Sequence, residues 1–187
     1  MKSIQEMTQA EAGAFVQSHL REKGILVVLS DGASVAIYTN GKYVSQDLDL
    51  INVYSVNRRA IRQAMNEIGF NEDGRYFKHP NSQFIVEFPP GPLTVGEEPV
   101  KQVDEIRLAT GILRIISPTD CVKDRLAAYY TSHGHELRFF QNFANAKCRA
   151  DWQSAYRYTK HGAWSAGGFK IKERSLCTLS VYHWGDQ

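Results

Sequence analysis

The chain has 187 residues, 43% of them hydrophobic, and a formal net charge of +2. Its length suits one domain of ordinary size, with or without a helical extension, and so small a net charge gives no argument for a nucleic-acid-binding protein. Three widely spaced cysteines indicate neither a zinc knuckle nor a disulfide framework, and the lack of a membrane-length apolar run or a signal core predicts a cytoplasmic protein without a membrane partner.

The first predicted element is a helix that begins after Thr8 and runs to about Lys23. Thr8 and Glu11 have the spacing of a capping box, in which each side chain accepts a hydrogen bond from the backbone N–H of the other residue. Gly24 follows as a typical helix end. The apolar and β-branched residues 25–29 then predict a buried strand.

Residues 30–50 predict a turn, a short helix and a second strand. The turn falls in the small and polar residues 30–34, the helix in the apolar residues 35–38, and the strand in residues 45–50 after the Asn40-Gly41 turn. A turn that leads into a helix places backbone N–H groups and the positive end of a helix dipole beside the second strand. Binding of a triphosphate requires such an arrangement.

Two carboxylates in the second strand are the first candidate site residues. Asp47 and Asp49 are two positions apart, so in an extended strand their side chains point to one face, roughly 6.5–7 Å apart at their bases. Such a pair can bind one hard cation such as Mg²⁺, which suits phosphoryl or nucleotidyl transfer. An edge strand with one wet face would give the same alternation of acids and leucines, and the pattern alone leaves that alternative open.

A helix and two more strands are predicted over residues 56–88. The helix covers residues 56–68 and is followed by a turn at residues 71–74, a strand at 75–79 and a strand at 83–88. Glu87 is the acid of this last, otherwise apolar strand, and burying it without a cation or a hydrogen-bond donor would be costly. Either Glu87 has such a partner, or it faces water at the end of the strand.

The remaining predictions up to residue 130 are a loop, a hairpin and a helix. Residues 97–99 are predicted to be loop. Residues 105–109 and 112–116 form a hairpin around Thr110-Gly111, and a helix capped by Ser117 runs to Tyr130.

The stretch Leu29-Ser30-Asp31-Gly32-Ala33-Ser34, followed by Tyr43-x-Ser45-x-Asp47-Leu48-Asp49, resembles the nucleotidyltransferase superfamily, whose pattern is a Gly-Gly or Gly-Ser turn followed by Asp-x-Asp. It looks most like small prokaryotic nucleotidyltransferase-like proteins related to abortive-infection and toxin–antitoxin transferases. The resemblance covers residues 24–130 or so and implies an α/β (α+β) fold, a small mixed sheet flanked by helices, followed by a C-terminal helical region. Asp31 departs from the pattern, because the family has a glycine there and the aspartate places a negative charge where a triphosphate should approach.

The resemblance also implies roles for individual residues. Asp47, Asp49 and Glu87 would be the catalytic residues and would bind Mg²⁺ or Mn²⁺. Five further residues would contact the nucleotide: Ser30, Gly32, Ser34, Ser45 and Lys123. Lys123 lies in a Pro-Thr-Asp-x-x-Lys-Asp-Arg-Leu stretch similar to one that follows the sheet in these transferases. Arg125 of the same stretch is the alternative phosphate contact, and a solvated charge cluster is the simpler explanation of both.

The implied function is metal-dependent transfer of a nucleoside monophosphate from an NTP to a hydroxyl acceptor. The acceptor would be an RNA end or a protein side chain, with a cognate toxin or antitoxin as one such partner. The alternative is a binding module that keeps the fold, has lost catalytic strength through Asp31, and acts as a toxin–antitoxin or regulatory partner.

The chain is predicted to divide into a nucleotidyltransferase-like domain, residues 1–131, and a mostly helical extension, residues 132–187, which is an insertion or a rearranged tail. Basic and aromatic residues of the extension fit a surface for single-stranded nucleic acid, or simply a core helix beside a solvated one.

Overall fold

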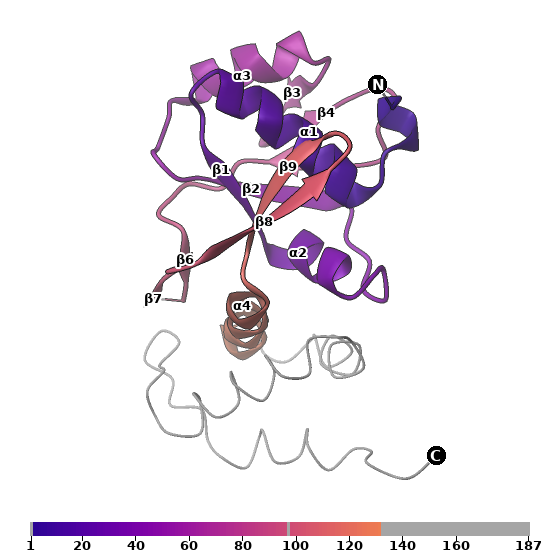
Figure 1. The fold of residues 1–187 in the computed structure, drawn as a ribbon. Helices are drawn as coiled ribbons and strands as arrows, with labels where there is room; N and C mark the ends of the chain where they lie inside the picture. The colour runs from indigo at the N-terminus through magenta and orange to yellow at the C-terminus, as the bar shows by residue number, and fades with distance from the viewer. Residues whose placement is uncertain (1, 97, 132–187) are drawn as a thin grey trace, which may run out of the picture.

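The computed structural model describes residues 2–96 and 98–131, with side chains up to Arg125, so the predicted extension lies outside the described residues. The helical elements are η1 (Ile4–Glu6), α1 (Gln9–Glu22), α2 (Asp31–Tyr38), α3 (Arg58–Glu67) and α4 (Pro118–Thr131) (Figure 1). The strands are β1 (Val27–Ser30), β2 (Asp47–Asn52), β3 (Asn71–Asp73), β4 (Tyr76–Lys78), β5 (Ile85–Glu87), β6 (Thr94–Val95), β7 (Glu98–Pro99), β8 (Val103–Leu108) and β9 (Gly111–Ile116).

Seven of the strands form one mixed sheet in the order β3-β4-β5-β2-β1-β9-β8. β2 runs antiparallel to β1 and parallel to β5, and β1 runs parallel to β9. β6 and β7 pair with each other in a small separate sheet. The predicted fold class, a mixed sheet flanked by helices, is therefore confirmed.

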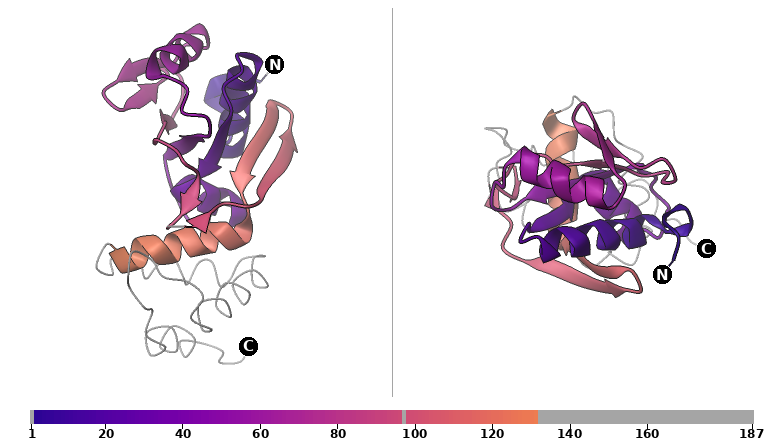
Figure 2. Two further views of the ribbon diagram at one scale, coloured as in Figure 1. Left: turned by 90° about the vertical axis from the view of Figure 1, so that its left-hand side faces the viewer. Right: turned by 90° about the horizontal axis from the view of Figure 1, so that it is seen from above.

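The core lies between this sheet and two helices. α1 contacts β1, β8, β9 and α3, whereas α2 contacts β2 and α4. Figures 1 and 2 show α4 at the end of the domain opposite α1 and α3. Leu48 and Leu50 of β2 are fully buried in this core. They pack in one cluster with residues of α1, of α3 and of the neighbouring strands: Val16, Leu20, Met65, Val86, Leu113 and Ile115.

The predicted caps of α1 and α4 are present. Thr8 Oγ1 accepts a hydrogen bond from Glu11 N at 3.3 Å, and Thr8 N donates to Glu11 Oε2 at 2.8 Å. At the start of α4, Asp120 N donates to Ser117 Oγ at 3.1 Å. Each cap satisfies a backbone N–H that the first helical turn leaves without a partner.

A buried glutamine fastens α1 to the sheet. The amide oxygen of Gln17 accepts from Arg114 N at 2.7 Å, and its Nε2 donates to Arg114 O at 2.9 Å. Gln17 is 4% exposed. Since these are the two backbone groups of one β9 residue, the side chain takes the place of a neighbouring strand at that point.

Four predicted boundaries are wrong. Residues 71–73 form edge strand β3 rather than a turn, because their backbone pairs with β4 while their polar side chains give no apolar alternation. Glu98–Pro99 is strand β7 rather than loop. Helix α2 begins at Asp31, not after residue 34. The β8–β9 turn consists of residues 109–110, one position earlier than predicted, since Leu108 pairs with Gly111.

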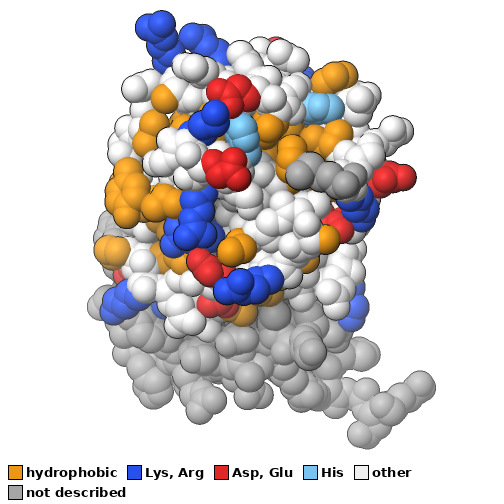
Figure 3. Space-filling model, turned by 45° about the horizontal axis from the view of Figure 1, so that its top comes forward, with side chains coloured by type: hydrophobic (Ala, Val, Ile, Leu, Met, Phe, Trp, Pro, Cys, Tyr) orange, Lys and Arg blue, Asp and Glu red, His pale blue; other side chains and the backbone are white. Residues whose placement is uncertain are grey.

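The face seen in Figure 3 carries a mixture of charges. Lys and Arg side chains are interspersed there with Asp and Glu side chains. Several of the exposed cations are paired, among them Lys23 with Glu67 and both Arg58 and Arg62 with Glu72. None of the helices in the described part of the chain is both long and apolar enough to cross a membrane.

Candidate functional site

Three of the predicted acids lie on two neighbouring strands. In the parallel pairing of β2 with β5, Asp49 is opposite Glu87 and Asp47 is opposite Ile85. Asp47 and Asp49 alternate with the buried leucines of β2, so the two aspartates and Glu87 share the face of the sheet that is turned away from the core. β2 lies between β5 and β1, so it is not the wet edge strand that the sequence pattern also allowed.

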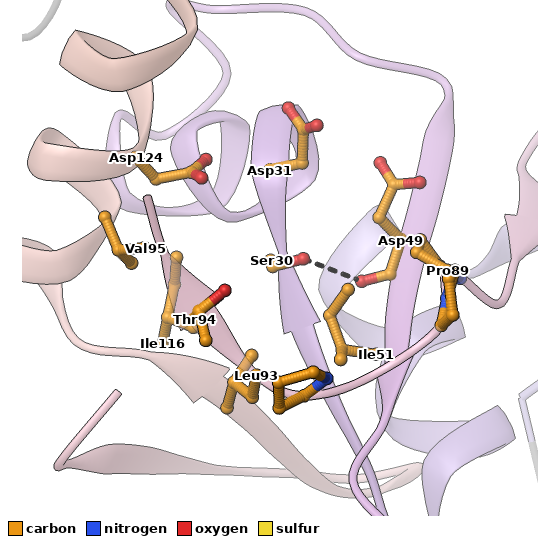
Figure 4. Close-up of a pocket in the computed structure, with 12 residues that line it drawn as sticks. Ser30, Asp31, Asp49, Ile51, Pro89, Leu93, Thr94, Val95, Ile116 and Asp124 are labelled. Atoms are coloured by element: carbon orange, nitrogen blue, oxygen red, sulfur yellow. Dashed lines mark hydrogen bonds between the residues drawn. The ribbon is translucent and has the colours of Figure 1, made fainter. Parts of the chain in front are cut away.

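A fourth carboxylate joins this group from the first residue of α2, directly after β1. Ser30 is opposite Asp49 on the antiparallel strand β1, and Asp31 is the next residue. In Figure 4 the carboxylates of Asp31 and Asp49 extend on the same side of the pocket. Burial raises the pKa of Asp49 to about 7, and the negative charges of Asp31, Glu87 and Asp47 add to this effect. The site therefore concentrates negative charge around a half-buried carboxyl group whose own ionised form is disfavoured.

An arginine from α4 partly balances that charge. Arg125 is buried, with 7% of its side chain exposed, and it forms an ion pair with Asp31. Its Nη2 and Nε also donate to Asp124 Oδ2 at 2.7 Å and 3.2 Å. The Arg125 charge lowers the pKa of Asp49, although burial and the three acids outweigh it. The pair links the turn after β1 to α4.

Of these four acids, Asp31 and Asp49 line a pocket of about 230 Å³, whereas Asp47 and Glu87 lie beside it. Ser30, Asp31 and Asp49 form its polar side, and Asp124 adds a carboxylate that points toward Asp31 (Figure 4). The rest of the wall is largely apolar and comes from β2, from the proline-rich segment after β5, from β6 and from β9: Ile51, Pro89, Pro90, Pro92, Leu93, Thr94, Val95 and Ile116.

The predicted nucleotide contacts divide into one that reaches the pocket and four that do not. Ser30 lines the pocket, and its Oγ donates to Asp49 O at 3.4 Å. Gly32 is buried at the start of α2, where an added Cβ would lie 3.1 Å from Ser45 Oγ. Ser45 Oγ itself donates to Asp47 O at 3.4 Å. Gly32 and Ser45 thus pack the turn against β2 without lining the pocket.

Ser34 and Lys123 also lie away from the pocket wall. Ser34 is fully buried, and its Oγ donates to Asp31 O at 2.6 Å and lies 3.3 Å from Cys121 Sγ. This serine holds the turn in place, so a direct contact with a nucleotide is not available to it in this conformation. Lys123 Nζ lies 3.6 Å from Asp120 Oδ1 and 4.0 Å from a glutamate of β7. Of the two cations considered for phosphate contact, Arg125 is the one beside the acids.

A second arginine lies beside Glu87. Arg75 Nε is 3.5 Å from Glu87 Oε2, and the guanidinium stacks over the ring of Tyr76 with its carbon 4.7 Å from the ring centroid. Tyr76 is opposite Glu87 in the β4–β5 pairing, so both belong to one row across the sheet. Sequence reasoning missed Arg75, because its position beside Glu87 depends on the register between β4 and β5.

The donor set fits a hard divalent cation in its chemistry. Asp47, Asp49 and Glu87 offer only carboxylate oxygens, which Mg²⁺ and Mn²⁺ prefer, and their mutual repulsion would be relieved by a cation. In the described residues no three His, Cys, Asp or Glu side chains are arranged to hold a metal ion. Glu87 pairs instead with Arg75, so the metal-binding role of the three acids stays a prediction.

No family model matches this chain, and no curated protein matches it. Among solved structures, an antigenic nucleotidyltransferase-like protein from Paracoccidioides brasiliensis is similar with a TM-score of 0.51 and 11% identity, over 92% of this chain and 85% of that one. The solution structure of the antibiotic-resistance factor ANT(2'')-Ia gives a TM-score of 0.48 and 13% identity, over 79% of this chain and 92% of that one. The crystal structure of ANT(2'')-Ia with adenylyl-2''-tobramycin gives a TM-score of 0.39 and 14% identity, over 88% of this chain and 90% of that one. At such identities the likeness to the first of these shows the fold alone.

Proposed function

We propose that this chain, which has a nucleotidyltransferase fold, transfers a nucleoside monophosphate from an NTP to a hydroxyl acceptor with release of pyrophosphate. One observation carries the proposal. Asp49 is opposite Glu87 on adjacent parallel strands, with Asp47 on the same face, and the pocket that begins at Ser30 lies beside them. Two acids in one strand and a third beside them are the donors that such a reaction needs.

Asp47 and Asp49 would hold Mg²⁺ or Mn²⁺, and Glu87 would complete the site. The cation would supply charge neutralisation at the phosphates and a lowered pKa for the acceptor hydroxyl. The raised pKa of Asp49, caused by burial and three neighbouring carboxylates, means that the ionised group is poorly stabilised by the protein alone. Binding of a cation would favour the ionised form of Asp49.

The chain's own residues would position the reactants. Ser30, with the backbone N–H groups at the start of α2, would bind the phosphates at the positive end of the helix dipole. Glu87 would accept the proton of the acceptor hydroxyl as its oxygen bonds to the α-phosphorus, while the bond from that phosphorus to the β-phosphate oxygen breaks. Arg75, paired with Glu87, would hold this carboxylate in place.

The acceptor remains a choice between an RNA end and a protein side chain, including that of a partner toxin or antitoxin. The mixed charges of the face in Figure 3 offer no extended basic surface there to favour RNA.

Label transfer tests the proposal. The full chain is incubated with Mg²⁺ or Mn²⁺ and each α-³²P-labelled NTP, with total RNA or a cell lysate as the source of acceptors. Labelling and pyrophosphate release should be lost in Asp49→Ala and Glu87→Gln. They should persist in Asp73→Ala, which removes a largely exposed acid from the edge of the same sheet. Labelling that persists in Asp49→Ala would refute the assignment of the site.

A second function is favoured by one residue. Asp31 places a carboxylate at the turn that would face the phosphates, and this carboxylate pairs with Arg125. A binding module that has lost catalytic strength, acting as a toxin–antitoxin or regulatory partner, would show no NTP binding at millimolar concentration in calorimetry. NTP binding that appears only in Asp31→Gly would support this second function over the first.

A further inference from the structure

Arg125 does not itself line the pocket, but it is paired with Asp31 and Asp124, which do, so it already has an anion on it. Asp31 pairs with Arg125, yet 49% of the Asp31 side chain is exposed, against 7% of the Arg125 side chain. Asp124, whose side chain is 25% exposed, holds the same guanidinium through Nε and Nη2. Arg125 is therefore held by the less exposed Asp124 through two donors, and it is also paired with Asp31, a carboxylate that is about half exposed.

The backbone at Asp31 is held in an uncommon conformation. Its φ of 57° lies in the left-handed region, which favours glycine and which few other residues adopt. The hydroxyl of Ser34 fixes this turn by donating to Asp31 O at 2.6 Å. As a result the Asp31 carboxylate extends over the pocket, beside Asp49 and opposite Asp124 (Figure 4).

We propose that Arg125 is the anion-binding cation of this pocket and that Asp31 is its built-in competitor. The Asp31 carboxylate occupies the place on the guanidinium that a substrate phosphate takes, and a phosphate binds by exchanging with it. A guanidinium pairs with carboxylate and phosphate in the same forked geometry, so one can replace the other. The inference rests on the proposed function, because it names the regulation of the same nucleotide site.

The size of the pocket agrees with such an exchange. Its volume of about 230 Å³ is smaller than the roughly 300–1,000 Å³ of typical ligand pockets. Asp31 and Asp124 line it and Arg125 does not, so rotation of Asp31 away from Arg125 would enlarge the space and open the guanidinium to it. Asp124 stays in place during the exchange, because it holds Arg125 through two donors.

The test measures anion binding in four forms of the full chain: wild type, Asp31→Asn, Arg125→Gln and the double variant. One arm titrates sodium tripolyphosphate in the presence of EDTA. The other titrates α,β-methylene-ATP with Mg²⁺, a nucleotide whose α–β linkage cannot be broken. Asp73→Asn is the matched control, because it removes the same charge from an ion pair with Lys78 at the edge of the sheet.

Asp31→Asn should bind tripolyphosphate about tenfold more tightly than wild type, which corresponds to about 1.4 kcal/mol. In the Arg125→Gln background the same change should give at most a twofold gain. The difference between the two gains separates exchange on Arg125 from simple removal of a negative charge. Asp73→Asn should leave the affinity unchanged.

Two results would overturn the inference. One is an equal gain in tripolyphosphate affinity from Asp31→Asn with and without Arg125. The other is no gain in affinity from Asp31→Asn in either background. If exchange is seen with tripolyphosphate while no form binds the nucleotide, the inference stands and the proposed function fails. If wild type labels an acceptor but Asp31→Asn gains nothing, the proposed function stands and the inference fails.

Folding of the variants is checked by thermal unfolding. Should Arg125→Gln not fold, Arg125→Lys replaces it, because lysine keeps the charge and loses the fork that pairs with two carboxylates at once. The gain from Asp31→Asn must then fall by at least half in the lysine background, and an undiminished gain refutes the exchange.

Discussion

Replacing Asp49 by asparagine should stabilise the protein in the absence of metal while abolishing nucleotidyl transfer. The pKa of Asp49 is raised from 3.8 to about 7, first by burial and then by Asp31, Glu87 and Asp47. Between those two pH values the folded protein keeps a proton that the unfolded chain has lost. Stability attributable to this group is therefore greatest at low pH and falls as the pH rises from about 4 to about 7.

The size of this stabilisation follows from the pKa shift of Asp49. A pKa change from 3.8 to about 7 corresponds to roughly 4 kcal/mol of unfolding free energy at about 1.36 kcal/mol per pH unit, and this value is an upper limit. Because Asp49 is only half-buried and its neighbours can rearrange, we expect about 1–2 kcal/mol of stabilisation from Asp49→Asn at about pH 8. For a chain of this length that is roughly 2–8 °C in the unfolding midpoint.

Thermal unfolding in EDTA at about pH 5 and about pH 8 measures the effect. The gain should be largest at the higher pH and fall to about a third of that value near pH 5, because above 3.8 the unfolded chain ionises while the folded protein keeps the proton of Asp49. Millimolar Mg²⁺ should stabilise wild type and leave Asp49→Asn almost unchanged. A variant that is equally stable to wild type at the higher pH, or less stable there, would refute the electrostatic reasoning.

Three further substitutions test the scaffold by chemical denaturation. Leu48→Ala removes a fully buried side chain beneath the acids and should cost about 2–5 kcal/mol, and a loss under 1 kcal/mol would contradict the core assignment. Gln17→Leu leaves both backbone groups of Arg114 without their partner and should cost about 1–3 kcal/mol, whereas no loss would mean that water replaces the amide. Thr8→Ala removes the α1 cap and should cost about 0.5–2 kcal/mol, with an unchanged midpoint counting against the capping box.

Local physics explains which elements the sequence could predict. The caps at Thr8 and Ser117 involve residues three positions apart in the sequence. The acids and leucines of Asp47 to Leu50 alternate with a period of two. Both patterns can be seen in the sequence without knowledge of the fold. β3 was missed because an exposed edge strand has no apolar face to reveal it. Its strand character comes from the backbone hydrogen bonds of β4.

The site was predictable only in part for a related reason. Pairing of Glu87 with Asp49 depends on register between strands separated by a helix and two further strands, which only the family resemblance suggested. The contact of Arg75 with Glu87 depends on the register between β4 and β5. The contact of Arg125 with Asp31 depends on how α4 packs against the start of α2. Lys123 lies two residues earlier in α4, and two residues rotate a helical side chain by about 200°, so Lys123 pairs with Asp120 rather than with Asp31.

Two arginines balance part of the negative charge at this site. Five carboxylates lie at this site: Asp31, Asp47, Asp49, Asp124 and Glu87. Arg125 pairs with two of them and Arg75 with one, so Asp47 and Asp49 are left as the acids to which neither arginine is paired. A divalent cation would find its strongest attraction at that pair, and phosphates arriving with it would compete for the arginines. Metal and nucleotide binding should therefore reinforce each other, because each relieves a charge that the other leaves unbalanced.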